Sequence, residues 1–220
     1  YTSRPVSYMK LSYENMDGAE HEVVAKMSVS EELVLNQAGE GRAYSEPVEL
    51  DGMSCVRMGS GAQKVLWRSG DDVRIDWGYF YMPAVNGEVT LGLTADVEGA
   101  FMKNGTLAPM ADKCVTSGAP GPKPTLAYMH NFGSVDNASS FTMLGYDEIQ
   151  DIEYMYHRYK GYWAHGGKVT IFQAFKKLQD QYASIMERCR AFDKMIYDDG
   201  MASGGKEYAE IGYKAQSIEL

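Results

Sequence analysis

The hydrophobic pattern of this 220-residue chain changes its period once, and that change constrains the fold most strongly. Up to about residue 144 apolar residues alternate with polar ones, as in Met9, Leu11 and Tyr13, which is typical of half-buried strands. From Tyr146 apolar residues recur at about 3.5–3.6 residues, as on one face of a helix. The pattern predicts a β domain over residues 1–144 and a helical part over 145–220.

The first part contains many short strands separated by turn formers, which favours an antiparallel β-sandwich over a parallel sheet with helical crossovers. Asp51-Gly52 gives the strongest hairpin signal, because this dipeptide suits a type I′ turn. The residues from Asp96 to Pro124 are too many for a hairpin loop, so they form a functional excursion or contain a short element. The expected strands are Met9–Tyr13, Val23–Val29, Val48–Leu50, Met53–Met58, Lys64–Arg68, Asp72–Met82, Glu88–Ala95, Thr125–His130 and Ser139–Leu144.

The second part predicts a linker helix followed by two antiparallel helices. The linker helix is expected over Tyr146–Trp163, with acidic residues in its first turns that match the helix dipole. The next helix begins at the capping box Thr170-Ile-Phe-Gln173 and runs to about Ile196. Gly200 and Gly204-Gly205 are expected to end it and to allow the chain to return as an αα-hairpin. A coiled-coil dimer is the alternative arrangement.

Charge and cysteine content limit the classes of function. The net charge of −9 argues against nucleic acid and anionic membranes, and no apolar run approaches the roughly 18 residues of a membrane span. Cys55, Cys114 and Cys189 form no CxxC pair, so they indicate three small hydrophobic residues or at most one Cys55–Cys114 bridge. The absent start methionine and the helical pattern that continues to Leu220 favour a piece of a longer protein.

The segment Asp72–Tyr81 is the densest candidate for chemistry. On a strand, Asp72, Arg74 and Asp76 share one face and offer two carboxylates and a guanidinium to a ligand or to acid–base work. In the alternative interpretation Arg74 is held between the two carboxylates and orders an interface.

Two further sets of candidates lie in the helical part. Asp147 and Asp151, four residues apart beside Glu148, could bind a metal or simply match the dipole of a helix start, and the second explanation fits better. His165 is a lone histidine at a helix end, for which a structural hydrogen-bonding role is expected. The GxSxG, HExxH, P-loop and GxGxxG motifs are absent, so we expect neither a cofactor nor a bound metal.

Five segments together resemble the glutaminase A-type family found in fungi and in gut and soil bacteria. They are Gly70–Tyr79, Met143–Tyr154, Tyr159–Trp163, Tyr182–Asp193 and Gly204–Ala209, and the resemblance runs in order from about Ser3 to Leu220. It implies an N-terminal β-sandwich, a linking helix and the first helices of an (α/α)6 toroid. It also implies a secreted or periplasmic hydrolase that converts the side-chain amide of glutamine into glutamate and ammonia. The family pattern places no catalytic residue on the positions present.

From these observations we expect an accessory region, inactive alone, whose partner is the remainder of its own helical catalytic domain. Its substrate in the whole protein is a small-molecule amide. One alternative is part of a glycoside hydrolase-like enzyme acting on a glycan. Another is a carbohydrate-binding module that stacks sugars on Trp77, Tyr79 or Tyr81. Apolar helix faces such as Ile171, Phe175 and Leu178 are expected to dock on the sandwich or to cause self-association.

Overall fold

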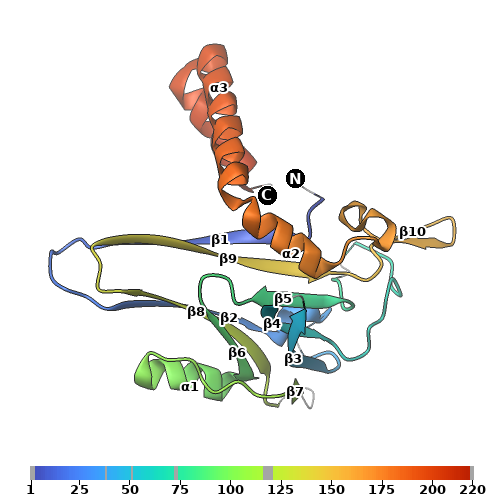
Figure 1. Cartoon of the computed structure of the whole chain (residues 1–220). Helices are drawn as coiled ribbons and strands as arrows, with labels where there is room; N and C mark the ends of the chain where they lie inside the picture. The colour runs from blue at the N-terminus through green and yellow to red at the C-terminus, as the bar shows by residue number, and fades with distance from the viewer. Residues whose placement is uncertain (1–2, 38, 51, 72–73, 116–120, 219–220) are drawn as a thin grey trace. The chain divides into compact units, whose positions relative to one another are not determined.

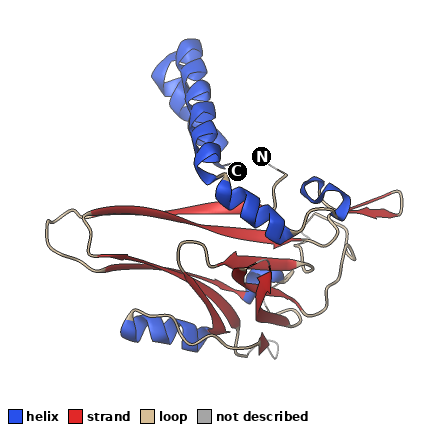
Figure 2. Cartoon of the chain, viewed as in Figure 1, coloured by secondary structure: helices blue, strands red, loops and turns tan. Residues whose placement is uncertain are grey.

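The described part of the chain is mainly β, with two main antiparallel sheets, a separate two-stranded hairpin and a few helices (Figures 1 and 2). A computed structural model describes residues 3–218 with gaps at 38, 51, 72–73 and 116–120. It divides into two compact units, residues 1–175 and 176–220. The first unit contains both sheets, and the second is helical.

The larger sheet has six strands in the order β1-β9-β5-β4-β3-β7. Every pairing in it is antiparallel, and the β3–β4 hairpin closes with Leu50 opposite Met53 around Gly52, whose φ is +77°. This confirms the hairpin predicted there, although Asp51 lies outside the described residues. The strands are β1 (Val6–Glu14), β3 (Ala43–Leu50), β4 (Met53–Ser60), β5 (Tyr79–Pro83), β7 (Cys114–Val115) and β9 (Asn137–Asp147).

The smaller sheet has three strands in the order β2-β8-β6, namely β2 (Val23–Ser30), β8 (Pro124–Gly133) and β6 (Glu88–Leu93). Alternate side chains of both sheets meet in one apolar core. Val56, Met58 and Met82 come from the larger sheet, and Leu91 and Leu126 from the smaller one; all five are fully buried. A shared core between two antiparallel sheets is the arrangement of a β-sandwich.

Short helices fill two connections of this unit. The 3₁₀ helix η1 (Glu31–Val34) follows β2, and α1 (Thr94–Asn104) follows β6. Gly105 ends α1 in the left-handed conformation, and its N–H donates to the carbonyl of Phe101. The expectation of a short element hidden in the stretch from Asp96 to Pro124 is therefore confirmed.

The structure corrects two predicted strands. The predicted strand Lys64–Arg68 is a loop, in which Leu66 has a φ of +51°. In the predicted strand Asp72–Met82, only the part from Tyr79 is a strand, and Arg74 and Asp76 lie in irregular backbone. Side chains hold this backbone: Asn36 Oδ1 accepts the N–H of Arg74 at 3.2 Å, and Gln63 Oε1 accepts that of Gly78 at 2.6 Å. Asp72 lies outside the described residues.

The predicted linker helix over Tyr146–Trp163 is wrong. Strand β9 continues to Asp147 because its last residues pair with β5, Tyr79 lying opposite Asp147. A turn follows, then the hairpin of β10 (Ile152–Tyr154) and β11 (His157–Tyr159), and then the 3₁₀ helix η2 (Tyr162–Gly167). Isoleucine and tyrosine favour strands, so these residues form strands although their spacing is that of a helix. The accessory domain predicted to end at residue 144 stays a prediction.

Helix α2 (Ile171–Asp180) begins with the predicted capping box, which is confirmed. Thr170 N–H donates to Gln173 Oε1 at 3.0 Å, and Gln173 N–H donates back to Thr170 Oγ1 at 3.2 Å. Phe172 and Phe175 pack edge-on against Tyr81 of the larger sheet, with ring centroids 5.6 and 6.5 Å apart. The start of α2 therefore docks on the sheet, as expected for Phe175.

The second unit consists of the end of α2 and of α3 (Tyr182–Ile218). At Gly205, with φ +77° and ψ −169°, the helix is interrupted, and the chain folds back so that Ala209 lies against Gly200. The predicted reversal at Gly204-Gly205 is thus present, whereas Gly200 stays inside the helix. Among the described residues, no helix is long and apolar enough to cross a membrane. The toroid itself stays a prediction.

Candidate functional site

A cleft of about 1220 Å³ opens between the two sheets. Ser7 and Met9 of β1 line it on one side, and Met27 and Val29 of β2 on the other. Both strands are the outermost strands of their sheets, so the cleft lies where the sandwich has its open side.

The lining combines apolar strand residues with charged loop residues. Apolar contacts come from Met9, Met27, Phe80 and Leu144, and the helix η2 adds Tyr162 and Trp163. The charged side chains of the cleft belong to Arg4, Glu32, Arg74, Glu148 and Asp151. Such a mixture suits a ligand with both apolar and polar parts.

The acidic turn, residues Asp147–Asp151, forms one wall of the cleft region. Asp147 Oδ1 accepts the N–H of Ile149 at 3.0 Å, and the carbonyl of Gln150 accepts Trp77 Nε1–H at 3.0 Å. Ile149 has a φ of +66°, a left-handed conformation that is unfavourable for a β-branched residue. Strained residues of this kind cluster at functional sites, where the surrounding structure holds them in place.

Close packing around Gly161 fixes the other end of this turn. The N–H of Asp151 donates to the carbonyl of Tyr159 at 2.9 Å, across the base of the β10–β11 hairpin. A Cβ on Gly161 would collide with Asp151 Oδ2 and would lie 2.9 Å from the indole of Trp163. A larger residue at position 161 would therefore have to displace the carboxylate of Asp151 and the indole of Trp163.

Burial changes the acidity of this wall. It raises the pKa of Glu148, and the neighbouring carboxylates of Asp151 and Asp147 raise it further. Burial also raises the pKa of Asp151, which the N–H of Gly161 partly opposes. A carboxyl group with a raised pKa holds a proton closer to neutral pH and can act as a general acid.

Tyr146 connects the acidic turn to the segment around Trp77. Its hydroxyl donates to the carbonyl of Trp77 at 2.8 Å. Burial raises the pKa of Tyr146, and the carboxylates of Glu148 and Asp76 add to the effect. Asp76 is only 6% exposed, and its buried carboxylate is close enough to Tyr146 to raise the pKa of that hydroxyl.

The structure brings most of the described candidate residues to the cleft or its acidic turn and leaves His165 apart from them. Arg74 and Asp151 both line the cleft, whereas Asp147 and Asp76 do not line it but raise the pKa of Glu148 and of Tyr146 respectively. His165 is exposed on η2, beside the ring of Tyr162 with centroids 5.8 Å apart, and does not line the cleft. The sequence interpretation missed Arg4 and Glu32, for which no local pattern gave a signal, and treated Glu148 only as a neighbour.

The structure also tests the expected roles of the aromatic residues around Trp77 and of the cysteines. Trp77 and Tyr81 are buried, and Trp77 is hydrogen-bonded to the carbonyl of Gln150, so neither offers a platform for sugar stacking. Cys55 and Cys114 are buried free cysteines, and Cys189 is free and half-buried. The described residues contain no cluster of three His, Cys, Asp or Glu side chains arranged to hold a metal ion.

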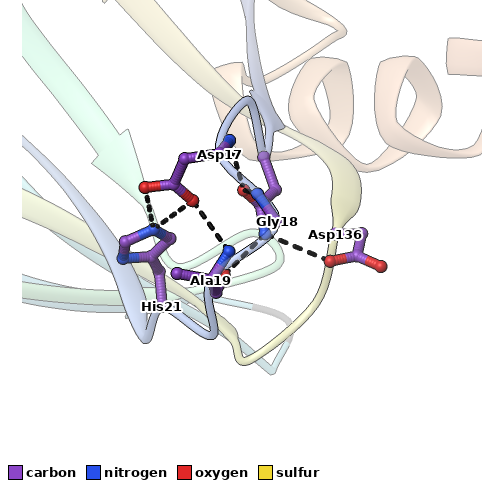
Figure 3. Close-up of polar contacts among 6 residues, drawn as sticks. Asp17, Gly18, Ala19, His21 and Asp136 are labelled. Carbon is purple, nitrogen blue, oxygen red and sulfur yellow. Dashed lines mark hydrogen bonds and ion pairs between the residues drawn. The ribbon is translucent and has the colours of Figure 1, made fainter.

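A second polar cluster joins β1 to β2 (Figure 3). Asn15 Oδ1 accepts the N–H groups of Asp17 and Gly18, each at 3.1 Å, and Asp17 Oδ1 lies 2.9 Å from His21 Nε2. The N–H of Ala19 donates to Asp17 Oδ1 at 2.9 Å. This bond and then that of His21 lower the pKa of Asp17. Asn15 Nδ2–H also donates to Asp136 Oδ1 at 3.2 Å, in the connection between β8 and β9. The bonds within the loop and this tie to the next connection explain the cluster as a structural turn.

Comparison with known proteins places this two-sheet chain in a family. Residues 1–199 match the family described as "Domain of unknown function (DUF5127)", and the chain belongs to that family. It is also 23% identical over 218 residues to Glutaminase A of Aspergillus oryzae (strain ATCC 42149 / RIB 40). That similarity covers 93% of this chain but 30% of the length of the relative.

Proposed function

We propose that this chain is the N-terminal, accessory region of a hydrolase related to glutaminase A. The observation that carries the proposal is the similarity to Glutaminase A, which spans 93% of this chain and 30% of that protein. The whole protein would hydrolyse the side-chain amide of glutamine: water adds to the amide carbonyl, the C–N bond breaks, and glutamate and ammonia leave. It would act in a secreted or periplasmic setting.

The docking of α2 supports a bracing role for the β-sheets. Phe175 is fully buried, and a Cβ on Gly145 of β9 would lie 2.5 Å from its ring, so the helix lies directly on the sheet. A six-stranded sheet that holds α2 in place is a suitable base for a helical catalytic domain. That domain, proposed to be an α/α toroid, would contain the reacting groups.

Ammonia release from glutamine tests this proposal. It is measured for the isolated 220-residue chain and for the full product of the gene that encodes it. We expect release only by the full product. Turnover by the isolated chain would show that the accessory role is wrong, and no turnover by either would exclude glutamine as the substrate.

The cleft favours a glycan as the second candidate substrate. Glu148 and Asp151 line it together with Tyr162 and Trp163. Paired carboxylates carry out most glycoside hydrolysis, and aromatic side chains commonly contact sugar rings. A panel of glycans offered to the full gene product checks this candidate, which fails if none binds or is cleaved.

A further inference from the structure

The hairpin of β10 and β11 exposes an unusual number of large apolar side chains. Figures 1 and 2 show it extending away from the two sheets. All of its strand residues are exposed. The exposed apolar side chains on the hairpin and just after it are Ile152 (59%), Tyr154 (63%), Met155 (67%), Tyr156 (96%), Tyr159 (50%) and Tyr162 (80%). Exposed apolar groups gathered in this way mark an interaction surface.

The tip of the hairpin adds an independent observation. Met155 and Tyr156 have φ values of +50° and +64°, as the two central residues of a type I′ turn require. Glycine, asparagine and aspartate are favoured at these positions, because other side chains are strained there. The chain instead places two large side chains at the tip, and Tyr156 is almost completely exposed.

Charge narrows the kind of partner. Glu153 and Arg158 lie opposite each other in the hairpin and form an ion pair of 2.9 Å, so these two charges balance. The two strands therefore present an aromatic surface whose acidic and basic side chains are paired, on a chain whose net charge is −9, and Lys160 directly after them adds one exposed positive charge. An apolar protein surface fits it, whereas a strongly charged one gains nothing from it.

We propose that the tyrosine arm, residues Ile152–Tyr162, docks on an apolar face of the helical region that follows residue 220 in the full protein. The chain spans 30% of the length of its relative, so most of such a protein lies outside it. In the sequence the arm lies between the last long strand, β9, and helix α2, where the chain passes from the sheets to the C-terminal helices. The proposal rests on the proposed function, because it requires the chain to be part of a longer protein.

Hydrogen exchange measured by mass spectrometry tests the docking directly. The backbone amides of residues 152–162 are compared in the isolated chain and in the full gene product. We expect exchange in the full product to be slower by at least about tenfold. Equal exchange in both proteins would overturn the proposal. Protection in the isolated chain that rises with its concentration would assign the arm to a second copy instead, and would also overturn it.

A variant separates docking from folding. The double change Tyr154→Ser and Tyr156→Ser should lower the thermal midpoint of the full product by about 2–4 °C and leave that of the isolated chain unchanged. Met102→Ser is the matched control, because Met102 is an exposed apolar residue on α1. An equal effect of the double change on both proteins would overturn the docking.

Glutaminase activity and docking of the arm are tested by separate measurements. Ammonia release by the full product decides whether it hydrolyses glutamine, whatever the exchange of the arm. An active full product with an unprotected arm would refute only the docking. A protected arm in a product without glutaminase activity would refute only the proposed substrate.

Discussion

At the scale of single residues, the acidic turn combines backbone strain with buried charge. Ile149 adopts a left-handed conformation, and Glu148 is a half-buried carboxylate beside Asp147 and Asp151. Both features oppose folding, so the surrounding contacts of Gly161 and Trp77 must compensate for them. This combination makes the acidic turn the best candidate for a functional site in the described residues.

Glu148→Gln should raise the stability of the isolated chain at neutral pH. The folded protein raises the pKa of Glu148 above 4.5, so the folded state binds the proton more tightly than the unfolded state. The penalty is complete above the folded pKa and disappears once the pH falls below about 4.5. We expect a rise of about 1–2 °C in the thermal midpoint near pH 7, and no rise near pH 3.5.

Glu88→Gln is the control for this change. Glu88 is an exposed carboxylate on β6, so its replacement removes the same charge without relieving burial. Equal gains from both variants would assign the effect to the net charge of the chain and would contradict the local explanation.

Local chemistry explains which single residues could be predicted. The capping box of Thr170 and Gln173 involves residues three apart, so the sequence alone was sufficient. The placement of Arg74 depends on Asn36, which lies 38 positions away in the sequence. The alternation of polar and apolar residues around Arg74 predicts a strand. That prediction fails because a local pattern contains no information about a hydrogen bond to a residue so far away in the sequence.

At the scale of elements, Phe172 and Phe175 form the contact between α2 and the larger sheet, and Phe175 is the more deeply buried of the two. Phe175 is completely buried, with its ring above Gly145 and edge-on to Tyr81. Phe175→Ala should reduce the free energy of unfolding by about 3–5 kcal/mol, because it leaves a cavity at this contact. Urea denaturation of the isolated chain measures the loss.

The neighbouring residue provides the control for this prediction. Lys176 is exposed in the same helix, and Lys176→Ala should change the stability by less than about 0.5 kcal/mol. A loss below about 1 kcal/mol for Phe175→Ala would show that the helix does not dock on the sheet as described.

The elements that were predicted wrongly share a physical cause. Residues 146–163 have helical spacing, yet Tyr146 and Asp147 are held by strand β5 and the following residues form a hairpin. Strand pairing joins residues far apart in the sequence, and a short periodic segment does not reveal it. By contrast, most strands of the two main sheets were predicted within a few residues of their bounds, although β5 and β6 are buried on both faces.

At the scale of the whole molecule, the unpartnered apolar surface differs from the one expected. The faces of Ile171, Phe175 and Leu178 are buried. The large exposed apolar side chains of the second unit lie instead on α3, at Phe192, Met195, Met201, Tyr208 and Ile211. Self-association therefore stays a prediction, but its surface moves from α2 to α3.

The isolated chain should self-associate through α3. Exposed apolar side chains at this density favour burial against a second copy, because burial removes them from water. Sedimentation velocity should show the average mass increasing between about 1 and 100 µM. The change of Phe192 and Met195 to Ser should abolish the increase, whereas Met102→Ser on α1 should not. A strictly monomeric chain over this range would contradict the prediction. It would mean that the apolar side chains of α3 remain exposed to water in the isolated chain without being covered by a second copy.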